Sequence, residues 1–148
     1  MTKVITADLI ELDVELHNKF DVINYIVKKM DVLHRTTDKS KLLEDIFLRE
    51  KEGPTSMGLG VAIPHAQTDS VTAPSVIFIR LKKDIDWNDD SNIRLIFGIC
   101  VPTSNSDNQH LKILAKISRN LLNEDFRSQL LTANTSEECE KILNKIND

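Results

Sequence analysis

Two apolar runs place the strongest constraint on how this chain can fold. Residues 76–81 and 93–101 are nearly continuous hydrophobic segments rich in β-branched side chains. A strand that faces water on one side alternates apolar and polar residues, whereas a strand covered on both faces is apolar throughout. The two runs therefore predict interior strands of a sheet that is covered on both faces. We interpret the polar stretch between them, residues 82–92, as a turn.

Helical periodicity accounts for most of the remaining chain, and residues 9–14 have the mixed pattern of a short strand. The apolar faces cover residues 22–30, 42–47, 107–121, 124–131 and 135–146. Gly53 and Pro54 are expected to end the second of these helices. The helix that begins near Asp107 would bury Leu111, Leu114, Ile117 and Leu121. Strands interleaved with helices predict an α/β fold, with a mixed β-sheet covered by helices on both faces. The order of the strands cannot be read from the pattern.

Length and composition exclude several classes of protein. The 148 residues, of which 41% are hydrophobic and 28% charged, are typical of one globular domain spanning residues 1–148. A net charge of −4 with scattered basic residues disfavours a nucleic-acid partner. The chain has no apolar run long enough to insert into a bilayer and no signal-like N-terminus, so we expect a cytoplasmic location. Cys100 and Cys139 lie in apolar patterns without a metal or redox motif and are interpreted as core thiols.

One segment departs from the composition of the rest. Residues 53–68, GPTSMGLGVAIPHAQT, contain no charged side chain, although about four or five would be expected for this chain. Three of the four glycines are here, and Pro64 immediately precedes His65. Glycine permits unusual backbone conformations, whereas proline fixes one. The sequence therefore predicts a loop that presents the His65 imidazole as a nucleophile or ligand.

Two further residues are candidates for the same site. Arg49 ends the helix before the loop, and His110 lies in the first turn of the helix that follows the second interior strand. Sites in open α/β sheets form beyond the carboxyl ends of strands, where His110 would lie. A simpler role is open for each, because Arg49 would also complement a helix dipole and His110 could be solvated. His17 and His34 have polar neighbours and are interpreted as surface residues.

These residues resemble the active-site signature of the fructose and mannitol class of enzyme IIA components of the phosphoenolpyruvate-dependent sugar phosphotransferase system. The resemblance rests on Arg49-Glu50, on Gly60-Val61-Ala62-Ile63-Pro64-His65 and on His110-Leu111. It implies that His65 is phosphorylated, that His110 is the second active-site histidine and that Arg49 lies beside them. Ser56 and Leu59 stand where the family often has glycine and asparagine, so no sugar is assigned.

The resemblance also implies the chemistry and the partners. A neutral imidazole, with an ordinary pKa of about 6.5, can accept a phosphoryl group near neutral pH. Attack through Nε2 is implied, with Nδ1–H held by an acceptor, while Arg49 and His110 contact the phosphoryl group. The sequence has no nucleotide-binding motif and no metal or cofactor signature, so another protein must supply the phosphate. The implied donor is HPr, and the implied acceptor is an enzyme IIB component of a membrane sugar permease.

Uncharged residues around His65 are candidates for a partner-docking surface. Met57, Leu59 and Val61 would form a rim for docking partners, although Val61 fits the domain core equally well.

Two alternative functions are open. One alternative is a regulatory enzyme IIA-like module whose phosphorylation state a partner senses. The other is a metal-dependent hydrolase using His65 and His110, for which the sequence offers no third ligand at recognisable spacing.

Overall fold

The computed structural model describes residues 3–103 and 109–147, without the side chains of Gln109 and His110. Five α-helices and five β-strands form within these residues. The strands are β1 (Ile10–Val14), β2 (Val61–Ala62), β3 (His65–Gln67), β4 (Ser75–Trp87) and β5 (Asp90–Val101). The helices are α1 (Lys19–Val32), α2 (Lys39–Glu52), α3 (Gln109–Leu121), α4 (Glu124–Thr132) and α5 (Ser136–Leu143), with short 3₁₀ turns at Ala7–Leu9 and Asn144–Ile146.

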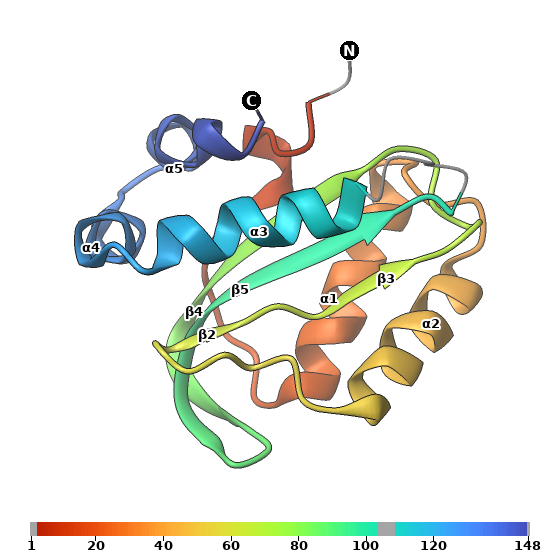
Figure 1. The fold of residues 1–148 in the computed structure, drawn as a ribbon, viewed down its shortest axis with the longest axis horizontal. Coiled ribbons are helices and arrows are strands. Elements are labelled where there is room, and N and C mark those ends of the chain that lie inside the picture. Colours follow the sequence, from red (N-terminus) through yellow and green to blue (C-terminus); the bar gives the residue numbers. More distant parts are fainter. Residues whose placement is uncertain (1–2, 104–108, 148) are drawn as a thin grey trace.

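The sheet is mixed and has the strand order β1-β4-β5-β2, with β3 also pairing with β5. β4 and β5 are antiparallel, whereas β1, β2 and β3 run parallel to their neighbours. α1 and α2 lie on one face, and α3 crosses the other face with α4 and α5 beside it (Figure 1). The predicted α/β fold, a mixed sheet covered by helices on both faces, is confirmed.

The two predicted interior strands form the centre of the core. Phe78 on β4 lies opposite Phe97 on β5, and their ring centroids are 5.1 Å apart. Gly98 is the neighbour of Phe97, and a Cβ atom there would lie 2.7 Å from Cδ1 of Ile26 on α1. The missing side chain therefore lets α1 pack directly on the sheet. α2 packs beside α1 in the same helix layer.

The predicted turn over residues 82–92 is wrong. β4 continues to Trp87 and β5 begins at Asp90, so only two residues connect the strands. Ile85 and Trp87 are buried, while the flanking acidic residues are exposed. This alternation is the pattern of a strand covered on one face only. The polar side chains therefore belong to the exposed face of a long hairpin and not to a loop.

The helix predictions are confirmed with local differences. α2 ends at Glu52 with Gly53 as its cap, as expected. The Thr135 hydroxyl caps α5 by accepting the Glu138 N–H at 3.1 Å. In α3, Leu111 is 54% exposed instead of buried, and Ile113 is buried. Leu111 therefore places an apolar side chain of α3 outside the face of the helix that packs on the core. The predicted start near Asp107 lies outside the described residues.

Arg80 on β4 anchors the second helix layer to the sheet. Its guanidinium is buried and donates to the carbonyl oxygens of Leu130 and Ala133 at 3.0 and 2.7 Å. It also donates to both carboxylate oxygens of Asp13, each at 3.0 Å, and this hydrogen-bonded pair lowers the pKa of Asp13. A buried cation needs such partners to offset its lost hydration. The end of α4 is therefore held on the strand beside β5.

Both cysteines belong to the core, as predicted. Cys100 and Cys139 are free thiols and fully buried. Burial raises the pKa of the Cys100 thiol to about 12 and also raises that of Cys139. Only the thiolate is a good nucleophile or metal ligand, so these side chains act as apolar packing groups. None of the helices in the described ranges has the length and apolar character needed to cross a membrane.

Candidate functional site

The uncharged segment over residues 53–68 is not only a loop. It contains β2 and β3, and His65 is the first residue of β3, paired with Ile99 of β5. The prediction that a loop presents His65 is therefore wrong. Each strand is too short to give a periodic pattern, and both are defined by their pairing with β5. A turn with positive φ at Gly58, Leu59 and Gly60 precedes β2.

The half-buried imidazole of His65 has a defined orientation. Its Nδ1 lies 2.8 Å from the carbonyl oxygen of Ile63, two residues earlier. A carbonyl oxygen only accepts hydrogen bonds, so in the neutral ring Nδ1 carries the proton and Nε2 carries the lone pair. Pro64 lies between the two residues and restricts the backbone that joins them. The strand edge thus sets both the ring position and its tautomer.

Arg49 lies in the last turn of α2 and shares two surface depressions with His65. Its guanidinium donates to the Gly53 carbonyl oxygen at 3.0 Å. The first depression has a volume of about 360 Å³ and is lined by Asp45, Leu48, Arg49, Glu52, His65, Ala66 and Gln67. The second, of about 470 Å³, is lined by Arg49, Pro54, Thr55, Ser56, Met57, Ile63, His65, Leu111, Leu114 and Ser118. The structure therefore brings Arg49 and His65 together, between one wall that carries acids and one that is mostly apolar.

His110 is the second residue of α3, and its side chain lies outside the described residues. The next residue, Leu111, and Leu114 one turn later both line the second depression. The first turn of α3 therefore borders the cavity that contains His65 and Arg49. This placement agrees with the expected position of His110 beyond the carboxyl end of β5.

Glu50 has a structural task that the sequence pattern does not indicate. Its carboxylate is buried and accepts the Thr55 N–H at 3.0 Å and the Thr55 hydroxyl at 2.5 Å. It also accepts the Nε1–H of Trp87 at 2.9 Å. These bonds satisfy a buried charge and hold the start of residues 53–60 against the β4–β5 hairpin. No sequence signal could reveal the bond to Trp87, because 37 residues separate the two partners.

We expect Glu50→Gln to reduce the free energy of unfolding by about 2 kcal/mol, because its amide NH₂ would face donors that now meet a carboxylate oxygen. Urea unfolding followed by the fluorescence of Trp87, the single tryptophan of the chain, measures this loss. Glu52→Gln is the matched control, because Glu52 is exposed two residues away. Equal midpoints for both variants and wild type would contradict the structural role of Glu50.

Asp45 brings a negative charge to the first depression. Partial burial acts to raise the pKa of this carboxyl group, but a hydrogen bond from the Thr68 hydroxyl and the Lys41 ammonium lower it, with a net pKa below the ordinary value. Asp45 is therefore ionised near neutral pH. Among the described side chains, no group of three or more His, Cys, Asp and Glu residues is arranged to hold a metal ion.

The remaining sequence candidates fall into two groups. His17 and His34 are exposed, in agreement with the surface positions expected for them. Of the three residues predicted to form a docking rim, Val61 is fully buried and belongs to the core. Met57 lines the second depression, and Leu59 is 49% exposed in the turn before β2.

Comparison with known protein families shows the family to which this chain belongs. The sequence matches the family described as "Phosphoenolpyruvate-dependent sugar phosphotransferase system, EIIA 2" over residues 3–146. The chain belongs to this family. The match confirms the resemblance found in the sequence. EIIA domains of this system are phosphotransferases.

Individual relatives agree with the family. The PTS system fructose-specific EIIA component of Haloferax volcanii is 32% identical over 99% of this chain and 96% of its own length. The nitrogen regulatory protein IIA-Ntr of Neisseria meningitidis has the same fold with a TM-score of 0.86 and 29% identity, over 95% of this chain and 96% of that one. The mannitol enzyme IIA of Escherichia coli, solved in complex with phosphorylated enzyme IIB, gives a TM-score of 0.80 at 20% identity over 95% and 96%.

Proposed function

We propose that this EIIA domain is a phosphoryl carrier that accepts a phosphoryl group from phospho-HPr on Nε2 of His65 and passes it to an enzyme IIB component, for coupled sugar uptake and phosphorylation. The observation that carries this proposal is the 2.8 Å contact between Nδ1 of His65 and the Ile63 carbonyl oxygen, beside Arg49 in the same depression. A ring held in this tautomer directs its nucleophilic nitrogen away from the strand edge. Such a carrier works in the cytoplasm.

The transfer itself is a displacement at phosphorus. The lone pair on Nε2 of His65 forms the new N–P bond, and the N–P bond of phospho-HPr breaks with its electron pair returning to the donor ring. Because Nδ1 keeps its proton, the phosphorylated ring of His65 becomes cationic. The Ile63 carbonyl oxygen accepts this proton in a hydrogen bond and so stabilises the charged ring. The same steps in reverse transfer the group to enzyme IIB.

Arg49 and His110 are proposed to complete the site. Phosphoryl transfer depends mainly on positioning and on stabilising charge on the equatorial oxygens. The guanidinium of Arg49 supplies a permanent charge and a planar set of donors for these oxygens. His110 is proposed as a second donor whose charge can change with protonation, so that the group is released as well as held. No metal ion or cofactor takes part in this scheme.

The mannitol relative supports an enzyme IIB acceptor, because that enzyme IIA was solved with its phosphorylated enzyme IIB. The mostly apolar wall of the second depression, formed by Met57, Leu111 and Leu114, is suited to a transient protein contact around His65. A protein acceptor is therefore proposed here as well.

A regulatory function is the second candidate. It is favoured by the similarity to IIA-Ntr, a nitrogen regulatory protein, which extends over 95% of this chain with a TM-score of 0.86. In this case the phosphorylation state of His65 would be sensed by a partner protein and would not be used to modify sugar. The two candidates share the same phosphorylation chemistry and differ only in the fate of the phosphoryl group.

The test is a reconstituted relay with phosphoenolpyruvate, enzyme I, HPr and each candidate enzyme IIB, run with and without EDTA once phospho-HPr has formed. We expect phosphoryl transfer to this chain and then to one enzyme IIB, at a rate that EDTA does not change. Phosphorylation of the chain without transfer to any enzyme IIB would favour the regulatory function. A loss of transfer that zinc restores would contradict the metal-free scheme.

A further inference from the structure

A series of hydrogen bonds links the buried carboxylate of Glu50 to the ring of His65. We propose that Glu50 acts through Thr55 as a positioning residue for phosphoryl transfer, by holding the strand edge that orients the His65 imidazole. The same contact holds the turn on which the guanidinium of Arg49 rests. The effect of these residues on transfer rests on the proposed carrier function.

The first contact joins the end of α2 to the segment before β2. Glu50 is 4% exposed and Thr55 is 8% exposed. One carboxylate oxygen of Glu50 accepts the Thr55 N–H and the other accepts the Thr55 hydroxyl. The Nε1–H of Trp87 on β4 donates to the same carboxylate. A buried carboxylate held by these donors has little freedom to rotate, so Thr55 is fixed through its main chain and its side chain.

Thr55 lies beside the residues that join β2 to β3. Its carbonyl oxygen accepts the Ile63 N–H at 3.0 Å. The Ile63 carbonyl oxygen is the group that lies 2.8 Å from Nδ1 of His65. β5 holds the same stretch of backbone through the Ile99 N–H, which donates to the Pro64 carbonyl oxygen at 3.0 Å. The acceptor for the ring is therefore held between β5 and Thr55, and a displacement of Thr55 would move it.

The end of α2 also positions the guanidinium of Arg49. The Glu50 carbonyl oxygen accepts the Gly53 N–H at 3.2 Å. The Gly53 carbonyl oxygen accepts from Nη1 of Arg49 at 3.0 Å. Only Pro54 separates Gly53 from Thr55, so the contacts of Glu50 close a short turn over residues 50–55. Because the Gly53 carbonyl oxygen belongs to this turn, the turn sets where the guanidinium lies.

The consequence is that one buried side chain aligns both the nucleophile and the cation beside it. If Thr55 shifts, the Ile63 carbonyl oxygen shifts with it and Nδ1–H of His65 loses its acceptor. The neutral ring can then carry its proton on Nε2, a form that has no lone pair there for attack. Misplacement of a reacting group by 1 Å can slow a reaction about a hundredfold. Loss of the contact between Glu50 and Thr55 should therefore slow transfer.

Single-turnover transfer from purified phospho-HPr tests the proposal with Thr55→Val, Thr55→Ser and Glu50→Gln. We expect Thr55→Val and Glu50→Gln each to lower the maximal rate about tenfold. The half-saturating concentration of phospho-HPr should not change, because both side chains are buried and do not meet the donor. Thr55→Ser should retain most of the rate, because it keeps the hydroxyl that Glu50 accepts.

The position of the ring proton gives a second readout, which needs no phosphoryl donor. Long-range proton–nitrogen NMR spectra of the isotope-labelled chain, recorded where the ring is neutral, distinguish Nδ1–H from Nε2–H. Comparison with His65→Ala assigns the His65 signals. We expect Nδ1–H in wild type and Thr55→Ser, and a larger share of Nε2–H in Thr55→Val and Glu50→Gln. A contact that only stabilised the fold would not move this proton.

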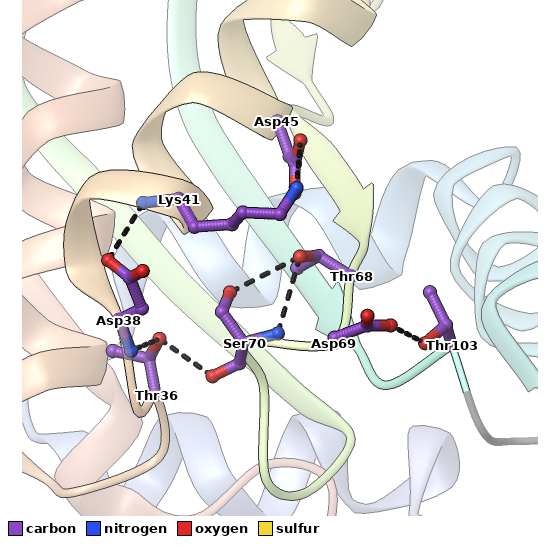
Figure 2. A network of polar contacts seen from close by, with 8 residues as sticks. All are labelled: Thr36, Asp38, Lys41, Asp45, Thr68, Asp69, Ser70 and Thr103. Carbon is purple, nitrogen blue, oxygen red and sulfur yellow. Dashed lines mark hydrogen bonds and ion pairs between the residues drawn. The ribbon is translucent and has the colours of Figure 1, made fainter.

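Thr36→Val is the matched control. Thr36 is also 8% exposed, and its hydroxyl donates to the Ser70 carbonyl oxygen at 2.8 Å (Figure 2). The substitution removes a buried hydroxyl bond in the connection between α1 and α2, outside the series that links Glu50 to His65. We expect the variant to have the transfer rate and the ring tautomer of wild type.

Urea unfolding of every variant separates lost folding from lost positioning, and Glu50→Gln keeps the test open if Thr55→Val does not fold. A wild-type maximal rate or an unchanged tautomer in folded Thr55→Val or Glu50→Gln would overturn the positioning role and leave the carrier function standing. Equal slowing by Thr36→Val would do the same. A wild-type chain that shows the Nδ1–H tautomer and takes no phosphoryl group would instead overturn the carrier function.

Discussion

His65→Ala is expected to take no phosphoryl group from phospho-HPr, while its unfolding midpoint stays close to that of wild type. The imidazole is half-buried at the start of β3 and is not one of the fully buried apolar side chains that form the core, so we expect its removal to change the unfolding midpoint little. Mass spectrometry of the intact chain should show one acid-labile phosphoryl group on wild type and none on the variant.

His34→Ala is the control for this result, because His34 is exposed in the turn after α1. It should be phosphorylated as wild type is. Full phosphorylation of the His65 variant, or a group that survives acid on a serine or threonine, would show that the site has been assigned to the wrong residue.

Arg49→Ala is expected to slow phosphoryl transfer about 10²- to 10³-fold, which is the usual loss when one donor to a developing charge is removed. Arg49→Lys should recover only part of the rate, because an ammonium replaces the charge but not the planar pair of donors. Separate single-turnover measurements of acceptance from phospho-HPr and of delivery to enzyme IIB give the two rates.

Lys51→Ala is the matched control for Arg49→Ala, because both side chains are cations in the last turn of α2. A residue that only complements the helix dipole contributes about 0.3 to 1 kcal/mol to stability and nothing to transfer. If both variants slow phosphoryl transfer equally and only slightly, Arg49 serves only to complement the helix dipole.

The fold could be predicted to the extent that it depends on local patterns. The continuous apolar runs identified the centres of β4 and β5, and Gly53 marked the end of α2. The far half of the hairpin was missed, because Ile85 and Trp87 alternate with acids and a short alternation resembles a polar turn. β2 and β3 could not be predicted, since two- and three-residue strands form only through pairing with β5.

The site was predictable where a sequence signature exists and not where distant residues meet. Arg49 and His65 were proposed from the motif, and the structure places both along the same depressions. The bond from Trp87 to Glu50 had no such signal, because it joins elements that are separate in sequence. Hydrogen bonds of this kind depend on how the elements pack and are not encoded in local composition.

The interruption between β2 and β3 also affects how this domain behaves at high concentration. Exposed strands at the edge of a sheet offer backbone donors that another chain can extend into an aggregate. At this edge Pro64 has no N–H, its carbonyl oxygen is used by the Ile99 N–H, and the Ile63 N–H is bonded to the Thr55 carbonyl oxygen. Ser56 in addition pairs with Ala62 across the outer side of β2. The proline that orients the His65 ring therefore also protects the sheet against intermolecular β-pairing.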